Sequence, residues 1–387
     1  MHNKIHRIMS DSANNGTSIG SSCLVFQHGR ELFGNSVGFA DKSRNIPMST
    51  DTVCRLFSLS KPITATAAMI AMDQGLFGPE THLAKFFPEF SHISLSSDST
   101  EIKQRDNVPP ITIEHLLNMT AGLPYPSDWC DSVRASGDVY MKLLNCRAKG
   151  ETYTTEQFAR DCASIPLYNV PDDYWFYGVE ADIIGAVIER SSGMRYSEFL
   201  KKHIFEPLEM TDTDFYVPES KRDRLAALYS WSDNRLVQTE CSHLGIEDFS
   251  DLPAFESGGA GIFSTINDYS KFANMLCTHG CHNNIRLISE KAFQYMTSPK
   301  FNSHQLRSMW DRLNGYNYSC FMRIMTDVEK SHIHSANGEF GWDGWTGTYF
   351  CAHPESGITV LYFTQICGAS TTDQAAEIVN TVFKELL

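Results

Sequence analysis

Ser58 and Lys61 form the only S-x-x-K pattern in the chain, and Pro62 follows them directly. Proline is tolerated within a helix only in its first turn, so a helix must begin near residues 59–61. Side chains three residues apart on a helical turn lie on the same side, with their Cβ atoms about 5–6 Å apart. Lys61 can therefore reach the Ser58 hydroxyl.

This pair has the residue types of nucleophilic catalysis. A serine hydroxyl is a weak nucleophile that needs a base beside it. Burial lowers the pKa of a lysine, which lets it act as that base or hold another base in its anionic form. A helix N-terminus also modestly favours negative charge on Ser58. The alternative is a structural N-cap, although a capping box would place Glu or Gln where Lys61 stands.

Tyr177 is the second candidate, because it lies in a turn ahead of a predicted helix. A tyrosine near a lysine ammonium can be stabilised as a phenolate and act as a base. The alternative is an aromatic side chain that only packs, which is common for tyrosine. Tyr177 is therefore interpreted as a third catalytic group that would act together with Ser58 and Lys61.

A glycine-rich turn at residues 341–348 precedes a predicted strand and is the third candidate. Glycine allows the backbone to approach a ligand closely. Backbone N–H groups of this turn could form half of an oxyanion hole, with the Ser58 N–H as the other half. The alternative is a tight turn that only leads into the strand.

Both ends of the chain are predicted to build a sheet that positions these groups. The apolar, β-branched segments 19–26 and 31–39 flank a turn and predict a hairpin. Segments 348–353 and 358–365 predict a second hairpin, and an amphipathic helix follows at 372–387.

The middle of the chain is predicted to be mainly helical. Helices are expected at residues 65–74, 113–119, 179–190 and 267–277. Each of the first three is followed by a segment that contains glycine, which is typical of a helix C-terminus. The sequence shows no internal repeat and no low-complexity linker.

These elements predict an α/β fold, with an antiparallel sheet flanked by helices and a second, mainly helical lobe. We assign residues 1–78 and 300–387 to the α/β sandwich lobe and residues 79–299 to the helical lobe. A small-molecule site is expected in the cleft between them. The length of 387 residues, with 42% hydrophobic and 20% charged residues, is sufficient for a sizeable core.

Charge and cysteine content restrict the partners and the compartment. The net charge of −14 disfavours nucleic acid and anionic membrane surfaces as partners. Eleven cysteines show no disulfide framework, the polar N-terminus does not resemble a signal peptide, and no 18-residue apolar run is present. We expect a cytoplasmic protein that takes a small ester or amide as its substrate. Its oligomeric state stays open.

Two other motifs are interpreted as structural. Ser18 lies in a G-x-S-x-G pattern, but a nucleophile elbow needs a strand before it and a helix after it. Here a polar tail precedes Ser18 and a predicted strand follows. Cys277, Cys281 and His282 lie at a helix end without a second ligand pair at zinc spacing. We expect no metal ion and no cofactor.

With its three motifs in this order, the chain resembles the serine β-lactamase and penicillin-binding protein superfamily. The likeness is greatest to the class C β-lactamase and family VIII carboxylesterase branches. Segments 111–124, 181–193, 204–216 and 258–276 also resemble the family. The resemblance implies the family's α/β sandwich lobe with a helical lobe, and the activity of a serine hydrolase.

The resemblance also implies a mechanism. Ser58 would attack a carbonyl and form an acyl-enzyme, while Lys61 and Tyr177 share its proton and pass it to the leaving group. Tyr177 would then help to activate the hydrolytic water. The backbone N–H groups of Ser58 and Trp345 would hold the oxyanion.

Two positions depart from the family pattern. An asparagine usually stands two residues after the tyrosine, but here Val179 cannot supply amide hydrogen bonds to a peptide-like substrate. The third motif begins with Trp342 in place of Lys or His. Without that cation an anionic substrate loses a contact of about 1.5–3 kcal/mol, or about tenfold to a hundredfold in affinity. The sequence gives no account of Asp343, which replaces a small residue.

Both departures point away from β-lactams and D-Ala-D-Ala peptides, so we expect a carboxylesterase for small or aryl esters. An apolar acyl or aryl pocket is one interpretation of the aromatic residues near the motifs, and ordinary core packing is the other. Other possible functions are β-lactamase, D-amino-acid amidase or peptidase, acyltransferase, and a catalytically silent binding protein. The expected substrate-binding residues are Tyr125, Val179, Trp342, Asp343 and Gly344.

Overall fold

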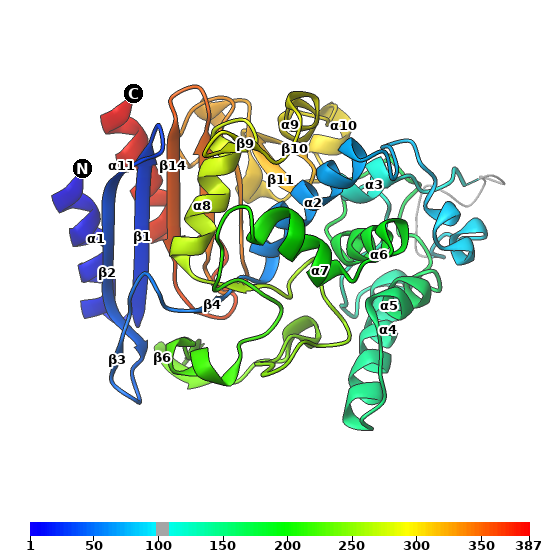
Figure 1. The fold of residues 1–387 in the computed structure, drawn as a ribbon, viewed down its shortest axis with the longest axis horizontal. Helices are drawn as coiled ribbons and strands as arrows, with labels where there is room; N and C mark the ends of the chain where they lie inside the picture. Colours follow the sequence, from blue (N-terminus) through cyan, green and yellow to red (C-terminus); the bar gives the residue numbers. More distant parts are fainter. Residues whose placement is uncertain (98–107) are drawn as a thin grey trace.

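Both ends of the chain contribute strands to one antiparallel sheet of eight strands (Figure 1). The computed structural model describes residues 1–97 and 108–387. The strand order is β10-β11-β12-β13-β14-β1-β2-β3, so the last strand of the chain pairs with the first. The strands are β1 (Gly20–Gln27), β2 (Arg30–Asp41), β3 (Ile46–Pro47), β10 (Tyr316–Ser319), β11 (Met322–Met325), β12 (Phe340–Asp343), β13 (Tyr349–His353) and β14 (Ile358–Phe363). The predicted antiparallel sheet is confirmed.

The central strands are buried on both faces. Val25 pairs with Val360, and Leu24 pairs with Leu361. Because side chains alternate along a strand, the first pair faces the cluster beneath α1 and α11, and the second faces the main core. Helices must therefore cover both faces of this sheet.

The helices are arranged on the two faces of the sheet and beside it (Figure 1). α1 and α11 pack on one face, and α8 packs on the other against β1, β13 and β14. The helices are α1 (His2–Asn14), α2 (Lys61–Asp73), α3 (Ile113–Leu117), α4 (Asp131–Ala148), α5 (Thr155–Cys162), α6 (Glu180–Ser192), α7 (Tyr196–Leu200), α8 (Ile266–Cys277), α9 (Glu290–Thr297), α10 (Ser303–Leu306) and α11 (Asp373–Leu386). No helix in the described part of the chain is long and apolar enough to cross a lipid bilayer.

The N-terminal segment corrects one expectation. The residues before Ser18 are polar enough to predict a tail, but they form α1 in the structure. Ile5, Ile8 and Met9 are buried on one stripe of this helix, at the spacing that lines up side chains on a helix face. Three apolar residues among polar ones gave too weak a pattern to predict the helix, which is held by packing on α11 and β2.

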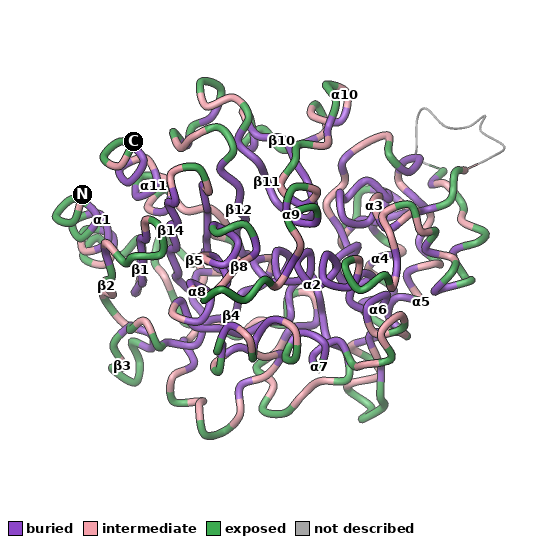
Figure 2. The backbone as a smooth tube through the Cα atoms, turned by 45° about the horizontal axis from the view of Figure 1, so that its top comes forward, coloured by how far each residue is buried: buried purple, intermediate pink, exposed green. Residues whose placement is uncertain are grey.

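α2 is the central helix of the molecule, and residues 61–71 are all buried (Figure 2). Pro62 lies in its first turn, as predicted. Small alanine and threonine side chains let α6 and α9 pack closely against it. A helix that is buried on all sides has no polar face, which agrees with its mostly apolar sequence.

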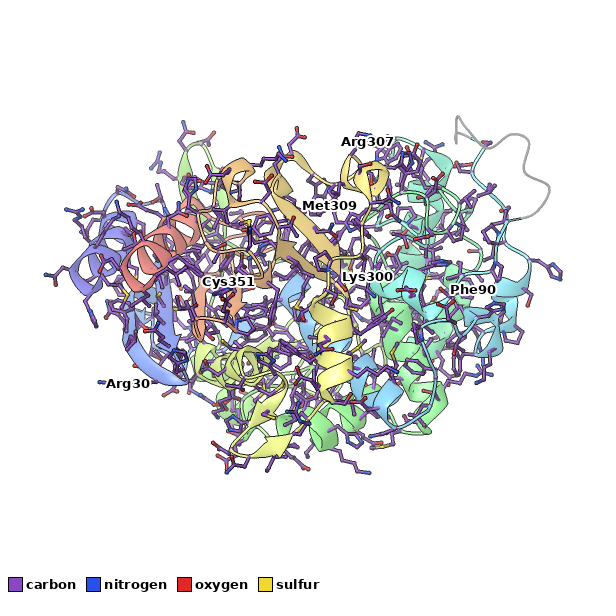
Figure 3. The ribbon with its side chains drawn as sticks, turned by 90° about the horizontal axis from the view of Figure 1, so that it is seen from above. Arg30, Phe90, Lys300, Arg307, Met309 and Cys351 are labelled. Carbon is purple, nitrogen blue, oxygen red and sulfur yellow. The ribbon has the colours of Figure 1, made fainter. Side chains whose placement is uncertain are left out.

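The region beside the sheet is mainly helical and contains two small hairpins (Figures 1 and 3). Figure 3 places Cys351 of β13 on the sheet side and Phe90 at the far end of the helical side. α8 falls within residues 79–299 in sequence, yet it packs on the sheet because its apolar stripe covers β13 and β14. The minor strands are β4 (Cys54–Arg55) with β7 (Phe263–Ser264), β5 (Leu228–Ser232) with β6 (Arg235–Thr239), and β8 (Cys281–His282) with β9 (Ile285–Arg286).

Candidate active site

Ser58 lies on a short 3₁₀ turn, Phe57–Ser60, that leads directly into α2. Phe57 has a φ of 45°, in the left-handed region that a bulky residue rarely adopts. Such a conformation persists only where the surrounding structure enforces it, and it is often found at functional sites. The turn leaves Ser58 partly exposed between the buried residues Phe57 and Leu59.

Lys61 is completely buried, and its Nζ contacts three oxygen atoms. It lies 3.1 Å from Ser58 Oγ, 3.0 Å from Tyr125 Oη and 2.9 Å from the Gly259 carbonyl oxygen. The predicted contact between Lys61 and Ser58 is therefore present in the structure. The glycine-rich loop at residues 258–261 supplies the carbonyl that fixes the end of the lysine side chain.

Burial lowers the pKa of Lys61 to about 7, although the carboxylates of Asp182 and Glu180 oppose this shift. A neutral amine has two N–H donors and one lone pair. It can donate to Gly259 and Tyr125 while accepting the proton of Ser58, so the three contacts fit a neutral lysine that acts as a base.

This pKa leads to a pH prediction. We expect kcat/KM for an ester to rise as the pH increases through about 7, because the proton-accepting form of Lys61 is the deprotonated one. Asp182→Asn removes a negative charge that favours the ammonium, so the midpoint should move to lower pH. The measurement is the pH profile of kcat/KM for both proteins.

A surface carboxylate provides the control for this experiment. Asp251→Asn removes a charge from an exposed position, so its profile should match the wild type. A midpoint that is the same in the wild type and in Asp182→Asn would contradict the assignment of Lys61 as the titrating base.

Tyr177 contacts Ser58, the predicted nucleophile. Its hydroxyl group is hydrogen-bonded to Ser58 and accepts a hydrogen bond of 3.2 Å from Trp342 Nε1. Burial raises the pKa of Tyr177, so its phenol is protonated at neutral pH. Because the indole N–H is the donor to Tyr177 Oη, the phenol O–H remains free to donate towards Ser58. The structure thus favours Tyr177 as a proton donor and Lys61 as the base.

Tyr125 is the second tyrosine of the site. An isolated antiparallel β-bridge between Pro124 and Gly178 brings Tyr125 and Tyr177 together. Their rings lie edge to face, with centroids 5.6 Å apart. Tyr125 Oη contacts Lys61, and burial raises its pKa well above the usual value. Tyr125, predicted as a substrate-binding residue, is therefore in a position to orient the lysine.

The turn after β12 is tied to the backbone just before Ser58. Thr346 donates its hydroxyl to the Arg55 carbonyl at 2.9 Å, and Thr348 donates to the Leu56 carbonyl at 3.1 Å. Within the described chain, neither the Ser58 N–H nor the Trp345 N–H pairs with a backbone acceptor. Two unpaired donors on connected segments match the predicted oxyanion hole.

Gly344 allows this close approach. A Cβ atom at this position would lie far inside van der Waals contact of the Leu56 carbonyl oxygen and of Thr348 Oγ1. Gly344 therefore has a backbone role, and no side chain could contact a substrate from this position.

We expect Gly344→Ala to lower the free energy of unfolding by about 1–3 kcal/mol and to reduce kcat by at least about tenfold, because the turn must move away from Ser58. Thermal unfolding and ester hydrolysis measure the two effects. Gly78→Ala is the matched control, since a Cβ atom at Gly78 meets no atom within 4 Å. Equal kcat in the two variants would contradict the proposed role of the turn.

The structure changes the interpretation of two predicted substrate-binding residues. Val179 is fully buried in the main core, so its side chain is not accessible to a substrate. Trp342 is also buried, and its contact is the hydrogen bond to Tyr177. Val179, two residues after Tyr177, is the N-cap of α6, and the first turn of that helix is buried in the core.

The structure gives Asp343 a partner. Its carboxylate accepts a hydrogen bond from Thr371 and forms an ion pair with Arg312 at 3.3 Å. The guanidinium carbon of Arg312 also lies 4.5 Å from the centroid of the Trp310 ring. The centroids of the Trp310 and Tyr177 rings are 5.0 Å apart. Asp343 thus anchors a half-exposed arginine beside the tyrosine.

Sequence reasoning missed three residues around the site. Asp182 accepts hydrogen bonds from Ser257 and from the Gly259 N–H, and so holds the loop that contacts Lys61. His243 stacks on the Trp345 ring at 4.3 Å. Trp310 lies against Tyr177. Asp182 could have been noticed as an acidic residue on an apolar helix, whereas His243 and Trp310 lie far from the motifs and carry no local signal.

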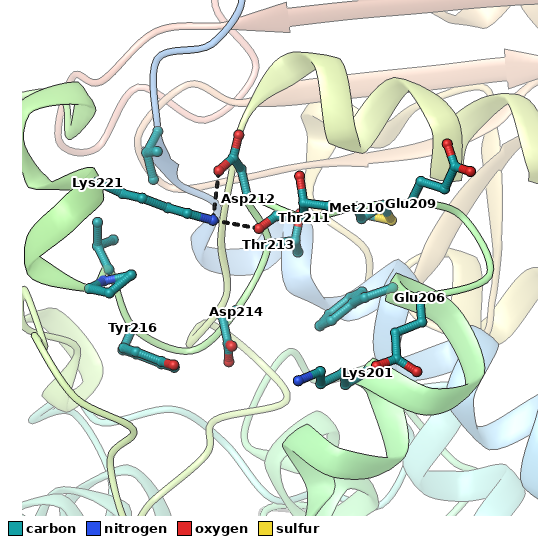
Figure 4. A pocket seen from close by; sticks show the side chains of 14 residues that line it. Lys201, Glu206, Glu209, Met210, Thr211, Asp212, Thr213, Asp214, Tyr216 and Lys221 are labelled. Atoms are coloured by element: carbon teal, nitrogen blue, oxygen red, sulfur yellow. Dashed lines mark hydrogen bonds and ion pairs between the residues drawn. The ribbon is translucent and has the colours of Figure 1, made fainter.

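A separate pocket of about 490 Å³ lies away from this site (Figure 4). Lys221 lies across it and contacts Asp212 at 2.8 Å and the Thr211 carbonyl at 2.6 Å. Among the described residues, its lining combines carboxylates and two lysines with apolar side chains and contains none of the predicted site residues. The predicted catalytic residues Ser58, Lys61 and Tyr177 therefore do not line this pocket.

Comparison with known proteins agrees with this geometry. The Beta-lactamase family model matches residues 5–381, which is nearly the whole chain. The chain therefore belongs to the beta-lactamase family of serine hydrolases.

Two relatives and one solved structure are similar to this chain over most of its length. Protein Rv1367c of Mycobacterium tuberculosis (strain ATCC 25618 / H37Rv) is 26% identical over 379 residues, which cover 94% of this chain and 90% of the relative. Esterase EstB of Burkholderia gladioli is 29% identical over 262 residues, covering 65% of this chain and 63% of EstB. The solved structure of EstCE1, a hydrolase with promiscuous acyltransferase activity, has a TM-score of 0.80 at 23% identity and covers 98% of both chains. This structural likeness confirms the predicted fold.

Proposed function

We propose that this protein is a carboxylesterase that hydrolyses small or aryl esters through an acyl-enzyme at Ser58. The observation that carries the proposal is the contact of Ser58 Oγ with Lys61 Nζ at 3.1 Å, beside the hydroxyl of Tyr177. A nucleophile with an adjacent buried base is the arrangement that acyl transfer requires. The similarity to EstB and EstCE1 supports the same class of substrate.

The geometry supports a definite order of proton transfers. Lys61 takes the proton of Ser58 as Oγ attacks the ester carbonyl, and the N–H groups of Ser58 and Trp345 stabilise the oxyanion. Tyr177, whose hydroxyl group is hydrogen-bonded to Ser58, donates a proton to the leaving alkoxide. Water then attacks the acyl-enzyme by the reverse sequence, with the same groups exchanging roles as acid and base.

Aromatic side chains around Tyr177 support an apolar or aryl substrate. Trp310 is 38% exposed and contacts both Tyr177 and Trp175. On another side, Trp129 is 54% exposed and packs on Phe176, the neighbour of Tyr177. Exposed tryptophans beside a nucleophile can bind an aryl or acyl group by burial of its apolar surface.

Acyl transfer to an alcohol is the second candidate, favoured by the similarity to EstCE1 with its promiscuous acyltransferase activity. The acyl-enzyme would be the same, and an alcohol would replace water as the acceptor. Adding an alcohol to the reaction and measuring the new ester against the free acid separates the two activities.

The test of the esterase proposal is the hydrolysis of a short-chain p-nitrophenyl ester, compared with a chromogenic cephalosporin under the same conditions. We expect the ester to be turned over and the β-lactam to be a poor substrate, because Trp342 supplies no cation for its carboxylate. Turnover of the cephalosporin with a higher kcat/KM than the ester would overturn the assignment in favour of a β-lactamase.

We also propose that the protein acts in a reducing compartment such as the cytoplasm, on small molecules. The proposal is supported by its eleven cysteines, which are all free thiols in the structure, and by a net charge that disfavours nucleic acid. Mass spectrometry of alkylated protein from cells would measure the thiol state, and a majority of disulfide-bonded cysteines would contradict it.

A further inference from the structure

Two cysteines far apart in sequence lie side by side near the proposed oxyanion turn. Cys241 follows β6 and Cys367 follows β14. The Cys367 N–H donates to the Tyr229 carbonyl of β5 at 2.8 Å, β5 pairs with β6, and the thiols of Cys241 and Cys367 interact with each other. Both are partly exposed. Cys241 also lines a surface pocket of about 750 Å³, so a small oxidant can reach its sulfur atom from solvent.

Cys241 differs chemically from the buried cysteines. The hydrogen bond from Cys367 lowers the pKa of Cys241 to about 6, and the His243 N–H donates to its sulfur at 3.1 Å. Burial instead raises the pKa of Cys54 to about 12 and that of Cys351 well above its usual value. Since the thiolate is the reactive form, Cys241 is the more reactive thiol at neutral pH.

The two segments that carry these cysteines both hold the oxyanion turn. Two residues after Cys241, the His243 ring stacks on Trp345 at 4.3 Å. One residue before Cys367, the Ile366 N–H donates to the Thr346 carbonyl at 2.9 Å. The Ser370 N–H, three residues after Cys367, reaches the Trp345 carbonyl at 3.5 Å. A change at either cysteine is therefore transmitted to Trp345 through one or two residues.

We propose that Cys241 and Cys367 form a reversible disulfide that displaces the turn around Trp345 and so reduces ester hydrolysis at Ser58. The regulatory half of this inference rests on the proposed esterase function, and the disulfide itself does not. A disulfide needs an S–S distance of about 2.05 Å, shorter than any thiol hydrogen bond, so its formation draws Cys241 and Cys367 closer together.

Hydrogen peroxide is the oxidant for which the reaction balances. The Cys241 thiolate attacks one peroxide oxygen, the O–O bond breaks, and a sulfenic acid and hydroxide form. The Cys367 sulfur then attacks the sulfenic sulfur, the S–S bond forms, and the sulfenic oxygen leaves as water with the proton of Cys367. Two thiols lose two electrons in total, and peroxide gains them. A dithiol reverses the reaction by thiol–disulfide exchange.

The experiment treats the full chain with hydrogen peroxide and maps the disulfides by mass spectrometry of peptides. We expect a crosslink between Cys241 and Cys367, with the free-thiol count falling by two from eleven. Hydrolysis of a p-nitrophenyl ester should fall about tenfold or more, since a displacement of about 1 Å at an active site can cost a hundredfold, and a dithiol should restore it.

Cysteine variants separate this switch from general oxidation damage. Cys241→Ser and Cys367→Ser should hydrolyse the ester at the wild-type rate and lose the sensitivity to peroxide. Cys281→Ser is the matched control, because Cys281 is equally partly exposed but lies on β8, and this variant should keep the switch.

Two results would overturn the inference. If peroxide produces no crosslink between Cys241 and Cys367, the disulfide does not form. If the crosslink forms and the rate of ester hydrolysis is unchanged, the disulfide does not control the site. Because the peptide map needs no substrate, it decides on the disulfide even if the protein turns over no ester, which keeps this failure distinct from failure of the proposed function.

Discussion

Ser58→Ala is expected to lower kcat/KM for a p-nitrophenyl ester by several orders of magnitude, up to about a millionfold, as for other serine hydrolases that lose their nucleophile. No other hydroxyl takes the place of Ser58 Oγ, since Tyr177 is held as a protonated phenol by burial. The variant should fold normally, because the lost hydroxyl is partly exposed and contacts only catalytic groups.

Ser18→Ala is the matched control for this measurement. Ser18 lies between α1 and β1, is buried, and donates its hydroxyl to the Gly20 carbonyl at 3.1 Å. Its G-x-S-x-G pattern has a helix before it and a strand after it, the reverse of a nucleophile elbow. We expect near-normal activity from Ser18→Ala. Full activity in Ser58→Ala together with loss in Ser18→Ala would reverse the assignment of the nucleophile.

Lys61→Met has the second largest expected effect, a fall in kcat of about a hundredfold to ten-thousandfold with a smaller change in KM. Methionine has a similar length and is apolar, so it fills the same buried space without the cost of desolvating an amine. The free energy of unfolding should therefore be unchanged or higher. Denaturant unfolding and steady-state kinetics measure the two effects independently.

Tyr177→Phe and Tyr125→Phe complete this comparison. If Lys61 is the base and Tyr177 the proton donor, Lys61→Met should lose the pH dependence near 7, whereas Tyr177→Phe should lower kcat and keep that dependence. Tyr125→Phe should have the smallest effect, since Tyr125 contacts Lys61 and not Ser58. A Lys61→Met variant with normal kcat would assign the base to Tyr177 instead.

The sequence predicted those parts of the site that depend on local spacing. Ser58 and Lys61 are three residues apart at a helix start, and Pro62 marks that start, so their contact follows from helix geometry. The two terminal hairpins were predicted from strands separated by short turns, and the sheet contains both. The resemblance of three ordered motifs then supplied Tyr177, which spacing alone could not connect to Ser58.

Contacts made only by long-range packing could not be predicted. His243 meets Trp345 across about a hundred residues of chain, and nothing beside it in the sequence marks it. Val179 stands where the family has a substrate-contacting asparagine. It caps an apolar helix, α6, that packs in the core, so Val179 is buried. The buried stripe of α1 was missed because its helix is stabilised by the far end of the chain.

The pairing of β1 with β14 has a consequence for biosynthesis. β1 is synthesised well before β14, and the edge of β1 that β14 covers stays open until then, since Val25 pairs with Val360. The turn after β12 is likewise synthesised almost 300 residues after Leu56. Thr348 in this turn donates a hydrogen bond to the Leu56 carbonyl, just before Ser58. Nascent chains should thus lack a competent catalytic centre until β14 has been synthesised, and its formation should be slow because this long loop must close.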